Sequence, residues 1–149
     1  MFARTLKVAL LVAAGWTFVG LGADEAKANY YSSYVYYPAG NYYYSYYYYQ
    51  PYSGYSGYQS HHCYYYPSYS TRYVYYYNPV SQVYWGRYAV GSKGEKRYSI
   101  LAKEDRKKSI KDIDESKFPP LAAMPPIPGA EDKVAMLPPP EDKLPKDAK

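Results

Sequence analysis

Tyrosine replaces the usual aliphatic side chains over a long central stretch of this chain. Of the 26 tyrosines, 23 lie between Tyr30 and Tyr77, where the only aliphatic side chains larger than alanine are Val35 and Val74. A packed interior is normally filled by Leu, Ile, Val and Phe, and a buried tyrosine hydroxyl needs a hydrogen-bond partner. So many hydroxyls in so short a segment are not expected all to find partners. The composition therefore predicts that most of these tyrosines meet water or other copies of the chain.

Proline divides the tyrosine-rich segment into short blocks. Four prolines each close a tyrosine cluster: Pro38, Pro51, Pro67 and Pro79. Tyrosine favours extended strands, whereas proline interrupts the hydrogen-bonded ladder of a sheet. Uncharged chains that mix aromatic and polar residues are disordered in isolation and prone to self-association. The sequence therefore predicts a mostly disordered, low-complexity chain with a small folded part.

The folded part is predicted between residues 72 and 118. Two strand-like runs, Tyr73–Tyr77 and Gln82–Val90, flank Asn-Pro-Val-Ser at 78–81, and asparagine followed by proline suits a tight turn. The run RYSIL at 97–101 can add a third strand. We therefore expect a small β-hairpin or a three-stranded meander here.

The sequence also predicts what lies on and beside this hairpin. Strict alternation along the second run places Trp85 and Arg87 on one face. From residue 102 the chain becomes highly charged, and Ile110 and Ile113 have the spacing of one apolar edge on a helical turn. We therefore expect a short helical segment packed on the hairpin. Its interleaved acidic and basic residues indicate a solvated surface rather than a site for an anionic polymer.

The N-terminal segment has the three parts of an export signal. Two basic residues precede an apolar run at Val8–Ala23, and Ala26 and Ala28 form the small-x-small motif that a signal peptidase cuts. We therefore expect residues 1–28 to be removed, which leaves Asn29 as the N-terminus of a protein exported to the periplasm, the cell surface or the medium. Cleavage at the end of the apolar run and an uncleaved membrane anchor are the alternatives. After cleavage we expect no stable membrane span.

The chain therefore divides into four predicted segments. A signal peptide at 1–28 is followed by a tyrosine-rich low-complexity head at 29–71, a small β-rich module with short helical turns at 72–118, and a proline-rich tail at 119–149. Proline at the density of the tail favours polyproline II and excludes helix and interior strand. We interpret the tail as a semi-rigid spacer, with a docking ligand at Pro125–Pro128 as the alternative.

Three adjacent residues, His61, His62 and Cys63, are the one candidate site for chemistry. Imidazole and thiolate bind copper, zinc and nickel, but adjacent residues lack the spacing of structural zinc ligands. We interpret them as weak metal candidates within a spacer. A single cysteine in an exported chain implies a free thiol or a disulfide between chains, and no neighbouring sequence supplies the partners of a nucleophile. We expect no cofactor and no enzymatic activity.

Charge excludes one of three classes of function for an exported aromatic chain. Without residues 1–28 the chain has 15 basic and 11 acidic residues, and the basic ones are not interleaved with the tyrosines, as nucleic-acid binding requires. The first remaining class is a structural or adhesive protein that self-associates, or coats a cell-surface polymer, through its tyrosine-rich head. The alternative is a binding module for a carbohydrate or a protein, centred on an exposed Trp85.

The arrangement of the tyrosines decides between these two classes. A sugar-binding module needs two or three aromatic side chains held in place on a rigid sheet, whereas many tyrosines in a proline-interrupted segment suit weak, redundant contacts. The sequence therefore favours the self-associating adhesive protein.

Several short motifs occur in a fixed order from residue 73 onward: YVYYYNP and VYWGRY, then YSIL, KEDRK, SIKDI, FPP, MPPIPG and MLPPP. With the export signal and the tyrosine-rich head, their order and spacing resemble a group of small exported tyrosine-rich proteins of planctomycete-type bacteria. The resemblance covers residues 72–140 and lies mainly in the YWGR and MPPIP strings. It implies export and a shared C-terminal module, and it implies no activity.

Overall fold

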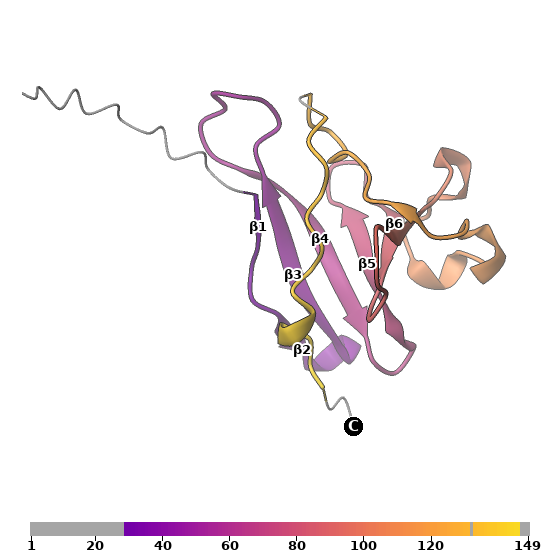
Figure 1. The fold of residues 1–149 in the computed structure, drawn as a ribbon. Helices are drawn as coiled ribbons and strands as arrows, with labels where there is room; N and C mark the ends of the chain where they lie inside the picture. The colour runs from indigo at the N-terminus through magenta and orange to yellow at the C-terminus, as the bar shows by residue number, and fades with distance from the viewer. Residues whose placement is uncertain (1–28, 132, 147–149) are drawn as a thin grey trace, which may run out of the picture.

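The tyrosine blocks and the hairpin that follows them form antiparallel strands. The computed structural model describes residues 29–131 and 133–146, so the predicted signal peptide with Ala26 and Ala28 lies outside the described residues, and Asn29 is the first of them. The strands are, in chain order (Figure 1), β1 (Tyr30–Tyr31), β2 (Val35–Tyr37), β3 (Tyr42–Tyr49), β4 (Gln59–Tyr66), β5 (Ser70–Asn78), β6 (Val83–Ala89), β7 (Lys96–Ile100) and β8 (Ala122–Ala123).

These strands join into one sheet. Its order is β1-β3-β4-β5-β6-β7-β8, and β2 also pairs with β3. Because β4 occupies one edge of β3, β1 and β2 share the other edge, where Tyr31 is opposite Tyr47 and Val35 is opposite Tyr44. The sheet therefore continues from the tyrosine-rich segment into the predicted hairpin, and the boundary predicted after residue 71 lies within β5.

The prediction of a mostly disordered, low-complexity chain is wrong, because residues 29–71 contribute β1 to β4 and the start of β5. The hydroxyls of Tyr31, Tyr76 and Tyr98 find partners in each other and in the C-terminal tail, whereas that of Tyr34 has none among the described residues. The Tyr31 and Tyr76 hydroxyl oxygens are 2.8 Å apart. The hydroxyls of Tyr31 and Tyr98 both donate to the Leu137 carbonyl, at 2.6 and 3.0 Å. These bonds offset the desolvation cost on which the prediction depended.

The predicted hairpin is present as β5 and β6, and the third predicted strand as β7. The predicted arrangement of side chains on β6 is wrong, however. The pairing of β5 and β6 shifts between Tyr76 and Tyr77, which makes Trp85 the extra residue of a β-bulge. The bulge reverses the alternation. Trp85 therefore belongs to the main core on one face, whereas Arg87 packs on Phe118 on the other.

The predicted helical segment is present only as single turns of 3₁₀ helix. Three such turns lie in it, η2 (Lys103–Asp105), η3 (Ile110–Asp112) and η4 (Glu115–Lys117), and the described residues include two more outside it, η1 (Pro38–Gly40) and η5 (Glu141–Lys143). The Ser109 hydroxyl caps η3 by accepting a hydrogen bond from the Lys111 amide at 3.3 Å. The described residues contain no α-helix, and so no helix long and apolar enough to cross a membrane.

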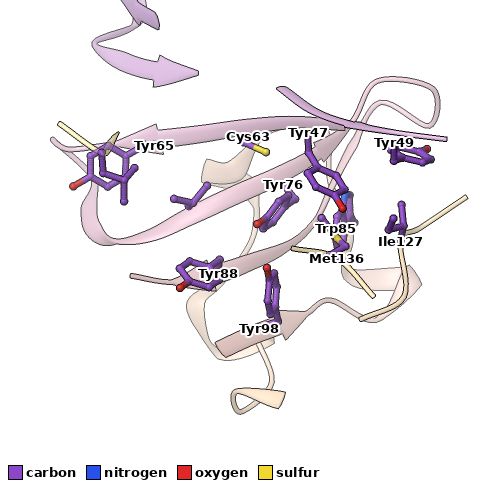
Figure 2. Close-up of a cluster of buried hydrophobic side chains, with 12 residues drawn as sticks. Tyr47, Tyr49, Cys63, Tyr65, Tyr76, Trp85, Tyr88, Tyr98, Ile127 and Met136 are labelled. Carbon is purple, nitrogen blue, oxygen red and sulfur yellow. The ribbon is translucent and has the colours of Figure 1, made fainter. Parts of the chain in front are cut away.

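The sheet is concave on the face that carries the main core. Tyr31 in β1 reaches Tyr76 in β5 although β3 and β4 lie between them, which requires the sheet to curl. Side chains from the sheet and the tail fill this face (Figure 2): Tyr47, Tyr49, Cys63, Tyr65, Val74, Tyr76, Trp85, Tyr88, Tyr98, Ile127, Met136 and Leu144. Tyrosine thus takes the place of most aliphatic residues in this core.

The proline-rich tail covers the concave face. Ile127, Met136 and Leu144 are buried against the tyrosines of the sheet, and the Tyr88 hydroxyl donates a hydrogen bond to the Glu141 carboxylate. Proline suits this position because a covering segment needs no ladder of backbone hydrogen bonds. The tail is therefore part of the folded core, and not the spacer that its composition predicts.

The opposite, convex face is covered over β5 and β6 by residues 101–118. A second cluster holds this segment: Tyr75, Tyr84, Leu101, Ile110 and Ile113. The Arg87 guanidinium lies between the rings of Tyr73 and Phe118, 3.7 and 3.9 Å from their centroids. Glu115 pairs with the same guanidinium at 2.8 Å. Residues 101–118 do not reach the part of the convex face over β3, which carries other tyrosines.

Candidate functional site

Aromatic side chains occupy the convex face over β3 and β4. Successive residues of a strand point to opposite faces, and Tyr47 and Cys63 point into the concave core, so the even-numbered residues of both strands point outward. We call seven of them the outer tyrosine face: Tyr42, Tyr44, Tyr46, Tyr48, His62, Tyr64 and Tyr66. All seven are half-buried, and none carries a formal charge at neutral pH with histidine neutral.

Ring contacts hold the side chains of the outer tyrosine face in place. The rings of Tyr42 and Tyr64 meet edge to face, with centroids 5.4 Å apart and planes at 82°, and those of Tyr46 and His62 meet at 4.9 Å and 87°. Tyr64 and Tyr66 stack at 6.0 Å and 23°. Such pairs contribute about 0.5–1.5 kcal/mol each beyond burial. The rings therefore form a positioned array rather than a set of independent side chains.

A shallow cleft of about 340 Å³ lies in this array, lined by Tyr37, Tyr42, Tyr44, Tyr46, His62 and Tyr64. The Tyr64 hydroxyl is bonded to His62 Nδ1 at 3.1 Å, whereas the hydroxyls of Tyr44 and Tyr46 have no hydrogen-bond partner within residues 29–131 and 133–146. Burial lowers the pKa of His62, which favours the neutral imidazole. The cleft thus offers ring faces and hydroxyls without charge, a surface that suits an uncharged, hydroxyl-bearing ligand.

The structure separates the three residues that the sequence singled out for metal binding. They are consecutive in β4, so His61 and Cys63 point into the concave core and His62 points to the outer tyrosine face. No group of three or more His, Cys, Asp or Glu side chains converges anywhere in the part of the chain that the structure describes. Because neighbouring residues of a strand point to opposite faces, His62 cannot join His61 and Cys63 in one metal site.

Cys63 is unpaired and fully buried in the concave core. Burial raises the pKa of its thiol well above the ordinary value, because the charged thiolate is poorly solvated there. A buried, protonated thiol is a poor nucleophile. The folded chain therefore does not present Cys63 to a second chain for the disulfide that the sequence left open.

Trp85, the aromatic residue chosen from the sequence as an exposed contact, is only 1% exposed. Its ring packs against Tyr76 at 5.1 Å and against His61 at 5.5 Å, between centroids. The residue is therefore part of the core and does not meet a partner. The aromatic array on the surface is instead the half-buried outer tyrosine face, whose individual residues could not be identified from the sequence.

His61 is buried as a neutral imidazole. It is 2% exposed, its Nε2 lies 3.2 Å from the Tyr49 hydroxyl, and its Nδ1 has no partner among the described residues. Burial lowers the pKa of His61 from 6.5 to about 4, and the neighbouring His62 adds to the shift. In the unfolded chain the His61 imidazole is therefore protonated below about pH 6.5, whereas in the folded chain it stays neutral down to about pH 4.

The free energy of unfolding is accordingly expected to decrease as the pH falls from 6.5 towards 4. The loss at this one site is about 3 kcal/mol, and burial of His62 acts in the same direction. Urea unfolding at a series of pH values measures it. The His61→Gln variant is expected to lose most of the slope between pH 6.5 and 5. An unchanged slope in that variant would show that other groups carry the pH dependence.

Comparisons of the chain with protein-family models, with curated proteins and with solved structures gave no match. The resemblance to exported tyrosine-rich proteins therefore stays a prediction, and so does export itself.

Proposed function

We propose that this chain is a non-enzymatic adhesive protein of the cell exterior that binds an uncharged polysaccharide through its outer tyrosine face. The observation that carries the proposal is the array of ring-locked tyrosines on the convex side of the sheet, with a cleft of about 340 Å³ and free hydroxyls at Tyr44 and Tyr46. Export comes from the signal peptide predicted at residues 1–28.

The chemistry of the cleft favours a neutral sugar polymer over other partners. A sugar ring has C–H faces that stack on aromatic rings and hydroxyls that exchange hydrogen bonds, and tyrosine offers both kinds of contact. No basic side chain lines the cleft, so it lacks the electrostatic attraction that nucleic acids and acidic polymers need. An open cleft also suits an extended chain better than a compact small molecule.

Because the tyrosines are held in a folded sheet, we propose glycan binding rather than the self-association that the sequence favoured. The sequence favoured self-association because its tyrosines were expected to make weak, redundant contacts. In the fold, many of them, including Tyr47 and Tyr76, are enclosed in the concave core, and those outside are held on a rigid sheet, which is what a sugar-binding surface needs. A convex face also meets a second convex face over a small area, whereas stable interfaces bury about 800 Å² per partner.

Replacing Tyr44 and Tyr46 together by serine tests the proposal. Each aromatic contact with a ligand is worth roughly 0.5–1.5 kcal/mol, so binding to insoluble neutral glycans such as cellulose and chitin is expected to weaken by about tenfold or more. Sedimentation with the glycan measures bound and free protein. The matched control is Tyr52→Ser with Tyr69→Ser, two tyrosines that are 45% and 52% exposed outside the face.

Two results would count against this function. The first is an equal loss of binding in the control variant, which would mean that exposed tyrosines act without regard to position. The second is unchanged glycan binding by the Tyr44→Ser, Tyr46→Ser variant together with weaker light scattering from its concentrated solutions. Self-association through the face would then take the place of glycan binding.

A further inference from the structure

A second cavity, which we call the end pocket, lies at one end of the sheet. It has a volume of about 430 Å³ and is lined by three segments that are distant in sequence: Tyr58 with the start of β4 (residues 59–61), residues 78–80 around the turn between β5 and β6, and the tail turn Pro128–Gly129. Tyr49, which also lines it, sits at the end of the core beside Ile127 (Figure 2). The end pocket shares no lining residue with the cleft of the outer tyrosine face.

The lining of the end pocket is uncharged and combines hydrogen-bond donors with apolar surface. The side-chain oxygen of Gln59 accepts a hydrogen bond from the Tyr49 hydroxyl at 3.3 Å, and the side-chain oxygen of Asn78 accepts one from the Val80 backbone amide at 2.9 Å. Their side-chain NH₂ groups have no partner among the described residues. Two residues with unpartnered side-chain amides therefore line the pocket, together with proline and valine.

His61 forms part of the wall of the end pocket. Its ring is held between Tyr49 and Trp85, with centroids at 5.2 and 5.5 Å, and Nε2 is bonded to the Tyr49 hydroxyl. Nδ1 is buried and has no partner within the described residues, a situation that folded proteins rarely leave uncorrected. Nδ1 is closed off from solvent, so His61 offers the end pocket a ring surface rather than a hydrogen-bonding atom.

The tail turn closes the pocket through a glycine. Gly129 has φ of 88°, and a Cβ at this position would lie 3.3 Å from the Tyr49 hydroxyl oxygen. Glycine therefore permits both the left-handed turn and its close approach to Tyr49. The wall formed by the tail is thus part of the fold and not a segment that happens to lie nearby.

We infer that the end pocket binds a small, uncharged, ring-shaped polyol, the chemistry of one or two neutral sugar units. Hydroxyls of such a ligand meet the free amides of Gln59 and Asn78, and its C–H groups pack on Pro79 and Pro128. A charged sugar finds no counter-charge among the lining residues and loses its hydration on entry. The inference does not depend on the outer tyrosine face, because the two sites share no lining residue.

Side-chain amide signals in NMR spectra of the full chain provide the test. Glucose and N-acetylglucosamine are the neutral probes, and glucuronate and glucosamine are their charged counterparts. We expect the neutral probes to shift the NH₂ signals of Gln59 and Asn78, and the charged ones to leave them in place. Absence of a shift with both neutral probes would overturn the inference, and so would equal shifts with the charged probes.

A pair of neighbouring substitutions then locates the binding. Val80 lines the pocket and is 89% exposed, so Val80→Trp fills the mouth without disturbing the core. Neutral-sugar affinity is expected to fall by about tenfold or more. Ser81→Trp, in the same turn but outside the lining, should bind as the parent does, and so should the Tyr44→Ser, Tyr46→Ser variant. Loss of affinity in Ser81→Trp to the same extent would contradict the assignment.

A third variant removes the Gln59 amide without adding bulk, and with it the acceptor of the Tyr49 hydroxyl. In Gln59→Leu the affinity for the neutral probes is expected to fall about fivefold or more, the effect of one lost hydrogen bond. Unchanged affinity in this variant would contradict the role given to the amide. If the end pocket binds sugar while the outer tyrosine face binds no glycan, only the proposed function fails. If the outer tyrosine face binds glycan while the end pocket binds no sugar, only the present inference fails.

Discussion

Deletion of residues 124–149 is expected to unfold the chain rather than to shorten a spacer. The tail places Ile127, Met136 and Leu144 in the concave core. Each buried side chain contributes about 1.5–3 kcal/mol. The deletion also removes the Leu137 carbonyl that accepts hydrogen bonds from the hydroxyls of Tyr31 and Tyr98, and each such bond contributes about 0.5–1.5 kcal/mol. The sum is comparable to the whole stability of a small domain, about 5–15 kcal/mol.

Near-UV circular dichroism and urea unfolding measure this loss, and two neighbouring point variants refine it. Met136 is 1% exposed and Leu137 is 47% exposed. We expect Met136→Ala to lower the free energy of unfolding by about 2–5 kcal/mol, and Leu137→Ala to change it by less than about 0.5 kcal/mol. If the shortened chain keeps its near-UV signal, or if both point variants behave alike, the tail is the spacer that its proline content suggests.

The hairpin could be predicted because its signals are local. Asparagine and proline at 78 and 79 specify the turn between β5 and β6, and the residues around them have strand propensity. The Asn78 side chain accepts hydrogen bonds from the amides of Val80 and Ser81, as such a turn requires. A few consecutive residues therefore contain the information for this part of the sheet.

The order of the tyrosine-rich segment could not be predicted in the same way, because the partners of its hydroxyls are distant in sequence. Tyr31 bonds to Leu137, 106 positions away. Composition counts the hydroxyls that need partners, but it does not show that a proline-rich tail will return to supply backbone carbonyls. The prediction of disorder was therefore an error about long-range contacts rather than about strand propensity.

The outer tyrosine face was hidden by the repetition of one residue type. In β3, tyrosine occupies both faces, so no alternation of apolar and polar residues identifies the buried side. One signal was available: Ser45 and Cys63, two small residues that are opposite each other in β3 and β4, both point into the concave core. Their positions fix which tyrosines of β3 point outward. No comparable signal marks the bulge at Trp85, because a bulge depends on pairing between strands.

Replacement of Trp85 by alanine is expected to lower the free energy of unfolding by about 3–5 kcal/mol, the usual cost of emptying a buried aromatic position. The ring lies in the core beside Tyr76 and Met136 (Figure 2). Its indole NH has no partner among the described residues, so its removal breaks no hydrogen bond and the cost is one of packing. Urea unfolding measures the change, and Tyr69→Ala, which truncates a ring that is 52% exposed, is the control.

The Trp85→Ala variant also tests whether glycan binds at Trp85 or at the outer tyrosine face. If Trp85 were the contact residue of a binding module, Trp85→Ala would reduce glycan binding while stability stayed near that of the parent. With Trp85 in the core and the outer tyrosine face as the binding surface, the order of effects is reversed. Stability falls, and the molecules that remain folded below the midpoint of unfolding bind glycan with the affinity of the parent. Tyr44→Ser with Tyr46→Ser is expected to weaken glycan binding by the folded molecules, because both hydroxyls are free and both rings line the open cleft. This variant also loses the ring contacts with Tyr42, Tyr48 and His62 and some of the stability that they contribute. The affinity of the folded molecules therefore decides between the two places, and weaker binding by folded Trp85→Ala would show that Trp85 is the contact residue.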